Sequence, residues 1–232
     1  VELAWRTLLH FLRTGELPDG SVIQLNTDSE VDVRFEPAER RVRLTRGEAH
    51  FTVASSPQRP FIVSAAGVDV RVVGTVFNVR LRSESVDVLV TEGKVRVGSA
   101  TEPALRAMAS PPAPVLSELT AGQKVSIALP TLAAPVATAP VAVPPAEIKQ
   151  VLAWQARRLD FDAAPLADIV GEINRYNRHK LVIADERLTA QRFGGSFPAG
   201  DSDTLVRMLE ANFGVIAERN GGETRLRLKP AP

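Results

Sequence analysis

The chain has 232 residues, of which 44% are hydrophobic and 24% charged, a balance typical of a soluble globular protein with one or two domains. Its 28 basic and 27 acidic residues leave a net charge of +1, which is too balanced for a surface that binds nucleic acid through its phosphates. The sequence contains no cysteine, which excludes disulfide bonds and thiolate metal sites.

Residues 1–16 are predicted to form a short amphipathic surface helix. Apolar side chains recur with helical spacing and are interrupted by basic residues, unlike the core of a signal peptide. No stretch of the sequence reaches the roughly 18 consecutive apolar residues that a membrane-spanning helix needs. A trimmed membrane-proximal segment is the alternative interpretation. The apolar positions are Leu3, Leu8, Leu9 and Leu12.

Residues 17–129 are predicted to form an all-β domain, either a β-sandwich or a solenoid-like fold. Apolar and polar residues alternate over short stretches, as in VDVRF at 31–35, and turn signals separate these stretches. SVDVLVTEGKVRVGS at 85–99 is interpreted as a hairpin that turns at Glu92–Gly93. The basic pair Arg40–Arg41 is interpreted as part of a solvated face. Many short strands with frequent turns favour a sandwich or a solenoid.

Residues 130–146 are predicted to form a linker to a second domain at 147–232. Nine of the 17 prolines lie between Pro103 and Pro145, and alanines are frequent among them. Such a composition leaves few stretches that can form a helix or a strand, so a semi-rigid and largely extended segment is expected.

The second domain is predicted to be α+β, with two βαβ-like units in tandem. Phe161 and Phe197 each precede a helical pattern, and the interval from Phe161 to Ile169 equals that from Phe197 to Leu205. Asp201 or the serine after it is expected to cap the second helix. Two such units would pack two helices on a small sheet.

Several motifs, taken together, resemble the FecR family of bacterial cell-surface signalling regulators. The motifs follow in the order and spacing of that family: PDGSVIQLN, RVRLTRGEAHFTVA, RPFIV, VVGTVFNVR, VTEGKVRV and LTAGQKV. Residues 154–214 resemble the C-terminal domain of such regulators. The resemblance gives that domain the fold of the short N-terminal signalling domain of TonB-dependent transducers and secretins. The family's sigma-factor-binding segment and transmembrane helix are not recognisable in this sequence.

The resemblance implies the periplasmic sensor region of an anti-sigma regulator, anchored in the inner membrane in the full-length protein. One expected partner is the periplasmic signalling domain of a TonB-dependent outer-membrane transducer, typically a receptor for ferric siderophores. The other is an extracytoplasmic-function sigma factor, bound through a cytoplasmic segment outside this chain. The chain would then be a binding module and not a turnover enzyme. The alternative is an envelope scaffold that contacts a secretin-like partner.

The Gly74–Thr75 pair is the one candidate for chemistry. From the residues alone it is a strand bend, in which glycine permits close packing. The resemblance adds a second interpretation, because some regulators of this family cleave their own chain at this Gly-Thr bond. Thr75 Oγ would attack the Gly74 carbonyl, and because a hydroxyl is a weak nucleophile it would need activation or strain. His50 is a candidate base only because it is a nearby titratable residue.

The last strand is the candidate partner-binding segment. In RLRLK at 225–229 basic and apolar residues alternate, as in an edge strand that can pair with another chain. The stretch LVIA at 181–184 is expected to be central in the same sheet. An ordinary terminal strand is the alternative. No pair of histidines has metal-binding spacing, so neither a metal nor another cofactor is expected. The proposed contact residues are Arg225, Leu226, Arg227 and Leu228.

Overall fold

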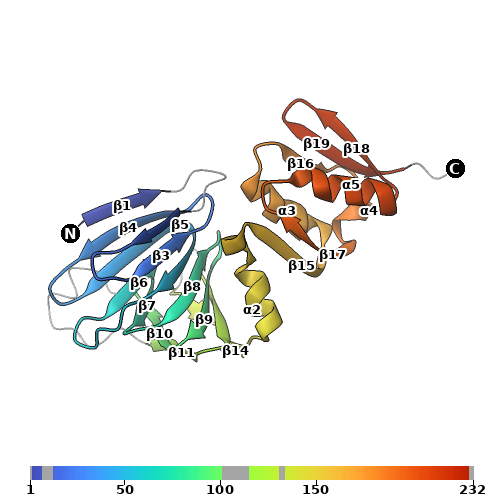
Figure 1. The fold of residues 1–232 in the computed structure, drawn as a ribbon. Helices are drawn as coiled ribbons and strands as arrows, with labels where there is room; N and C mark the ends of the chain where they lie inside the picture. The colour runs from blue at the N-terminus through green and yellow to red at the C-terminus, as the bar shows by residue number, and fades with distance from the viewer. Residues whose placement is uncertain (1, 7–12, 101–114, 131–133, 230–232) are drawn as a thin grey trace. The chain divides into compact units, whose positions relative to one another are not determined.

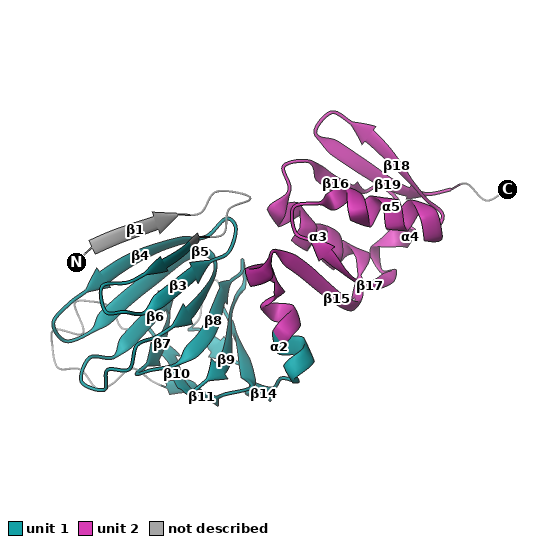
Figure 2. Ribbon diagram, in the orientation of Figure 1, with its two compact units in different colours: residues 1–148 teal, residues 149–232 magenta. Residues whose placement is uncertain are grey.

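The structure is a computed structural model that describes residues 2–6, 13–100, 115–130 and 134–229. The chain divides into two compact units, residues 1–148 and residues 149–232 (Figure 2). The first is called the β unit and the second the α+β unit below. The predicted fold class, mainly β followed by a small α+β region with βαβ units, is confirmed.

The β unit is one nearly closed, barrel-like sheet (Figure 1). Its two halves share the long strand β5: β4, β6, β7, β10 and β11 belong to one half, and β3, β8, β9 and β12 belong to the other. The strand order is β11-β10-β7-β6-β5-β8-β9-β12-β13, with β4 and β3 paired to different parts of β5. Its strands are β1 Glu2–Arg6, β2 Arg13–Glu16, β3 Val22–Leu25, β4 Glu30–Phe35, β5 Arg40–Thr52, β6 Phe61–Ala65, β7 Val68–Val72, β8 Val76–Leu81, β9 Ser85–Glu92, β10 Lys94–Ser99, β11 Val115–Thr120, β12 Gln123–Ala128, β13 Val136–Ala137 and β14 Val141–Ala142.

The chain bends at glycines where it passes between the two halves. β7 pairs with β6 and β10, whereas β8, which follows Gly74, pairs with β5 and β9. In the same way β9 pairs with β8 and β12, whereas β10, which follows Gly93, pairs with β7 and β11. The predicted hairpin at Glu92–Gly93 is therefore wrong, because Gly93 turns the chain between two halves of the sheet and β9 is not paired with β10.

The apolar face of this bent sheet encloses a core built around three phenylalanines from different strands. Phe51 stacks on Phe77 with a centroid separation of 5.1 Å and meets Phe61 edge-on at 6.0 Å. All three side chains are fully buried. Because successive residues of a strand point to opposite faces, the period-two pattern in the sequence supplies this core.

The predicted helix at residues 1–16 is wrong where the structure describes the chain. Residues Glu2–Arg6 form β1, antiparallel to β4, and Arg13–Glu16 form β2, antiparallel to β3. A helix this short is marginal in water by itself, and an edge strand offers unpaired amides and carbonyls that the segment can satisfy. Residues 7–12 of the prediction lie outside the described residues.

Residues 134–144 of the proline-rich segment before the α+β unit lie along β12. Two short bridges, β13 and β14, pair antiparallel with β12. The amide of Thr138 donates to the Ser126 carbonyl at 2.9 Å, and that of Val143 donates to the Gly122 carbonyl at 2.7 Å. Proline has no amide hydrogen to donate, so the pairing is limited to short stretches between the prolines.

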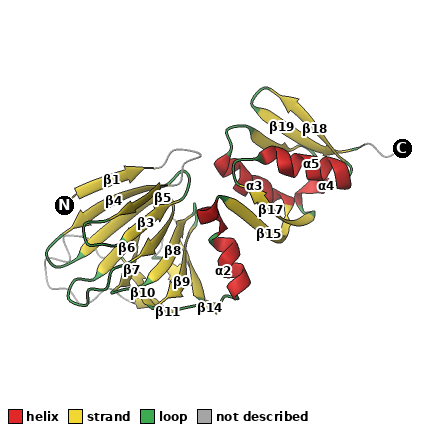
Figure 3. Ribbon diagram, in the orientation of Figure 1, coloured by secondary structure: helices red, strands yellow, loops and turns green. Residues whose placement is uncertain are grey.

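The α+β unit has two small sheets and two long helices (Figure 3). β15 and β17 form a two-stranded sheet, and the three-stranded sheet has the order β16-β19-β18. The elements, beginning with the helix that spans the division between the units, are α2 Pro145–Val151, the 3-10 helix η1 Ala153–Ala156, β15 Arg158–Pro165, α3 Leu166–Tyr176, β16 Lys180–Ile183, α4 Glu186–Thr189, β17 Arg192–Pro198, α5 Ser202–Asn212, β18 Val215–Asn220 and β19 Glu223–Leu228.

The two repeated units predicted from the sequence contact each other through their first strands, because β15 pairs antiparallel with β17 in the two-stranded sheet. Leu159 pairs with Phe197 in register, and the rings of Phe161 and Phe197 lie 6.2 Å apart. The helix that follows each phenylalanine buries its apolar stripe. The Asp201 side chain accepts a hydrogen bond from the Thr204 amide, as the sequence predicted for a helix cap. The buried stripe of α3 consists of Leu166, Ile169, Val170, Ile173 and Tyr176, and that of α5 includes Leu205, Val206 and Leu209.

Candidate functional site

The Gly74–Thr75 bond lies in the bend between β7 and β8, where the chain crosses between the two halves of the sheet. Gly74 is exposed, whereas Thr75 is buried with 4% of its surface accessible. The bond therefore joins an exposed glycine, which supplies the carbonyl, to a buried threonine, which supplies the hydroxyl.

Hydrogen bonds hold the backbone on both sides of this bond. The amide of Ser56 donates to the Val73 carbonyl, and the amide of Val53 donates to the Thr75 carbonyl, both at 3.0 Å. The hydroxyl of Thr75 donates to the carbonyl of Lys94 at 3.0 Å. The two residues that flank Gly74 are thus fixed to the segment 53–56, and the threonine side chain is fixed to the start of β10.

Close contacts explain why positions 74 and 93 are glycine. A Cβ atom on Gly74 would lie 2.9 Å from both Cα and Cβ of Ser55, closer than real Cβ atoms approach. Gly93 has φ of +82°, and a Cβ there would lie 3.0 Å from the Gly74 carbonyl oxygen and 3.1 Å from Thr75 Oγ. Only glycine tolerates both the left-handed backbone and this approach. Gly93 therefore packs directly against the candidate bond.

His50 is not brought to Thr75. It lies in β5 opposite Asn78, three residues from Val53, the residue whose amide binds the Thr75 carbonyl. Three residues of a strand span about 10 Å. Burial lowers the pKa of His50 to about 4, so its imidazole is neutral at neutral pH. The proposal of His50 as a base for Thr75 finds no support in this placement.

The chemistry open to this bond depends on geometry. The Thr75 hydroxyl donates to the carbonyl oxygen of Lys94, which accepts the hydrogen bond but is not a general base. An attack on the Gly74 carbonyl would require the hydroxyl to leave Lys94 and turn toward the preceding residue. The hydrogen-bonded peptides before Gly74 and after Thr75 restrict the backbone conformations in which the hydroxyl can rotate in this way.

A buried arginine near the bend is the residue that the sequence analysis missed. Arg40 is 1% exposed, so its interpretation as part of a solvated face is wrong. Its guanidinium donates to the Asp19 carboxylate at 2.6 Å and to the carbonyl of Val73 at 3.4 Å. The signal was present in the period of β5, since Arg40 is in phase with the buried Val42 and Leu44.

The segment predicted to bind a partner is not an edge strand. β19 is the central strand of its sheet, parallel to β16 on one side and antiparallel to β18 on the other. Its backbone groups are consequently used within the sheet, and Leu226 is fully buried. The alternation of charged and apolar residues reflects one buried and one solvated face, which a central strand of an open sheet also shows. Arg225 and Arg227 lie on the solvated face, where they pair with Glu223 and Glu218.

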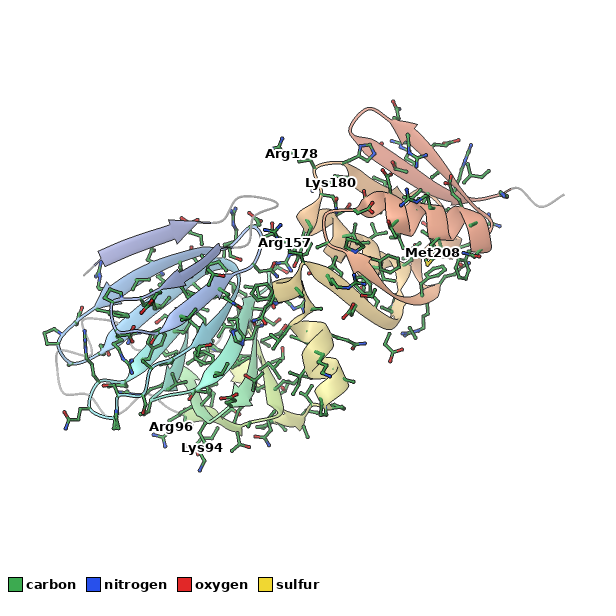
Figure 4. All side chains as sticks on the ribbon, in the orientation of Figure 1. Lys94, Arg96, Arg157, Arg178, Lys180 and Met208 are labelled. Atoms are coloured by element: carbon green, nitrogen blue, oxygen red, sulfur yellow. The ribbon has the colours of Figure 1, made fainter. Side chains whose placement is uncertain are left out.

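The outer edge of β16 is closed by a side chain. Asn174 of α3 accepts a hydrogen bond from the Leu181 amide at 2.8 Å and donates to the Leu181 carbonyl at 2.9 Å. Lys180, labelled in Figure 4, donates to the carbonyls of Asn174 and Asn177 at 2.7 and 2.8 Å. The stretch 181–184, expected to be central, is therefore an edge strand that an amide side chain caps in place of another strand.

Two classes of feature are not found among the described residues. No group of three or more His, Cys, Asp or Glu residues is placed to hold a metal ion there. Within the same residues, no helix has the length and apolar character to cross a membrane.

Comparison with known proteins finds a family similarity within the β unit. Residues 6–96 match the family described as FecR protein. No curated protein matches the chain. Two crystal structures of a candidate anti-sigma factor from Parabacteroides distasonis are similar in fold. One has a TM-score of 0.74 at 20% identity, covering 99% of this chain and 100% of the other. The second has a TM-score of 0.72 at 20% identity, covering 98% of this chain and 100% of the other.

Proposed function

We propose, from the similarity of residues 6–96 to the FecR family, that the chain is the periplasmic sensor region of an anti-sigma regulator. In this role it binds the signalling domain of a TonB-dependent outer-membrane transducer. It then controls an extracytoplasmic-function sigma factor in siderophore-dependent iron uptake. The observation that carries the proposal is the family match over residues 6–96.

The fold of both units supports this role. The similarity to the Parabacteroides distasonis structures extends over the β unit and the α+β unit together. The α+β unit has charged pairs on an exposed face and small sheets with edges, which are features of a docking module. The chain is accordingly proposed to work by binding.

Binding to an isolated transducer signalling domain tests the role. Titration calorimetry with the full chain should show a stoichiometric complex, whereas the N-terminal domain of a secretin should not bind. Tight binding of the secretin domain alone would favour the envelope scaffold instead.

The solvated face of β19 is the proposed contact surface. Replacing Arg225 and Arg227 by glutamate reverses two exposed charges without changing the buried Leu226, and should weaken the complex with the signalling domain. Arg96→Glu is the matched control, because Arg96 is an exposed, ion-paired arginine on a strand of the other unit (Figure 4). Equal binding by the double variant and the control would exclude this surface.

A second part of the proposal is a single self-cleavage between Gly74 and Thr75. Thr75 Oγ bonds to the Gly74 carbonyl carbon as the Gly74 C–N bond breaks, and the hydroxyl proton is carried to the released Thr75 amine. Water then hydrolyses the ester, which leaves a carboxylate on Gly74 and restores the Thr75 hydroxyl. The tight packing of the bend around a buried threonine supports this chemistry, since a constrained backbone can supply part of the activation that a hydroxyl needs.

Mass spectrometry of freshly purified protein tests the cleavage. Two fragments with a new N-terminus at Thr75 are expected, and Thr75→Ser should retain them because it keeps the hydroxyl. Thr75→Val preserves the shape of the side chain and should leave the chain intact. A wild-type chain that stays intact under all conditions would exclude self-cleavage while leaving the binding proposal standing.

A further inference from the structure

Arg40 is the first residue of β5 and gathers several separate segments of the β unit around one buried charge. Nε donates to the Arg59 carbonyl at 2.9 Å, and Nη1 donates to the Ala54 carbonyl at 2.8 Å. The same Nη1 pairs with Asp19 at 2.6 Å, and Nη2 donates to the Val73 carbonyl at 3.4 Å. A buried guanidinium is costly unless it is paired, and this one is paired through every nitrogen.

The Asp19–Gly20–Ser21 turn orients this arginine. Asp19 accepts hydrogen bonds from the amide and the hydroxyl of Ser21 at 3.1 and 2.7 Å as well as from Arg40. Ser21 Oγ in turn accepts the amide of Ala54 at 3.0 Å. Burial by itself would raise the pKa of Asp19, but the hydrogen bonds from Ser21 and Arg40 outweigh it and hold the pKa below its usual range. The ionised pair therefore persists to acidic pH.

Arg40 is connected to the Gly74–Thr75 bond in two ways, through the carbonyl of Val73 and through the carbonyl of Ala54. Val73, whose carbonyl it binds, immediately precedes Gly74, and the Ser56 amide binds the same carbonyl. Ala54, whose carbonyl it also binds, follows Val53, the residue that holds the Thr75 carbonyl. The guanidinium thus contacts the peptide before Gly74 directly, and it is linked to the peptide after Thr75 through Ala54 and Val53.

We infer that Arg40, oriented by Asp19, is a positioning residue that sets the conformation of the Gly74–Thr75 bend. The inference rests on the proposed self-cleavage for its chemical consequence. With the flanking peptides fixed, the remaining freedom lies in Gly74 and in the Thr75 side chain, which are the groups that must reorient for attack. A misplacement of about 1 Å can slow such a reaction on the order of 100-fold.

Arg40→Lys is the decisive variant. Lysine keeps the charge opposite Asp19 but cannot donate to three carbonyls in a plane, so fragment formation should slow about 10- to 100-fold. Arg41→Lys is the matched control, because Arg41 is the adjacent arginine of the same strand and its ion pairs are with Glu39 and Asp69. The control should cleave at the wild-type rate. Circular dichroism verifies that both variants are folded.

Chemical rescue separates positioning from a general loss of stability. Millimolar guanidinium, far below denaturing concentrations, should restore part of the cleavage in Arg40→Ala and leave Arg41→Ala unchanged. A folded Arg40→Lys variant that cleaves at the wild-type rate would overturn the inference.

Amide hydrogen exchange decides the inference independently of cleavage. The amides of Ser56 and Val53 bind the carbonyls on each side of Gly74, so both should exchange faster in Arg40→Lys than in wild type or Arg41→Lys. If the wild-type chain stays intact and these amides exchange faster, self-cleavage fails but the control of the bend by Arg40 holds. Unchanged exchange at both amides would overturn it, whether or not the chain cleaves.

Discussion

Acidification should destabilise the β unit through His50. Burial lowers the pKa of this side chain from 6.5 to about 4 in the folded chain. Below pH 6.5 the unfolded chain binds a proton that the folded chain does not, so the stabilisation present above pH 6.5 is lost as the pH falls to about 4. At about 1.4 kcal/mol for each pKa unit, the loss amounts to about 3 kcal/mol of the free energy of unfolding.

Urea unfolding at a series of pH values and constant ionic strength measures this loss. Glutamine at position 50 does not titrate in this range, so the His50→Gln variant should not show this loss. The unfolding free energy of wild type minus that of the variant should therefore fall by about 3 kcal/mol between pH 7 and pH 4. Far-ultraviolet circular dichroism follows the β unit. Parallel stability curves for the two proteins would refute the reasoning, and an NMR titration of the His50 ring would show its pKa directly.

Three further predictions concern Gly93, Asn174 and the fragments that cleavage would produce. Gly93→Ala should cost more stability than Gly20→Ala, by about 1 kcal/mol in chemical unfolding, because both glycines have positive φ but only Gly93 faces the Gly74 carbonyl. Equal losses of stability in the two variants would mean that the bend accommodates a Cβ atom at position 93 without additional cost. Asn174→Ala should lower the unfolding free energy by about 1–3 kcal/mol by leaving backbone groups of β16 unpaired, and the exposed edge should promote association seen by light scattering. After cleavage the two fragments should coelute in size-exclusion chromatography, because β7 and β8 are each paired with other strands; separation without denaturant would contradict this.

Period-two patterning and turn chemistry determined much of the fold in advance. The alternation in β4 and β5 predicts the buried face of the sheet, and the equal spacing after Phe161 and Phe197 predicts two repeated units that do pair in one sheet. These features are local, and each follows from the fixed geometry of a strand or a helix. The same local pattern also contained the burial of Arg40, although charge alone suggested a solvated face.

Only the tertiary structure decided which strands are neighbours. The first residues pair with β4 and β3 because those strands present free edges, which helical spacing in the sequence does not reveal. β19 is central although it comes last, because the chain places β18 and β16 on its two sides. The surroundings of Gly74 likewise come from distant segments, namely Ser55 and the glycine that begins the crossing to β10. Sequence determined that glycine and threonine stand at this bend, and long-range contacts determined what holds them there.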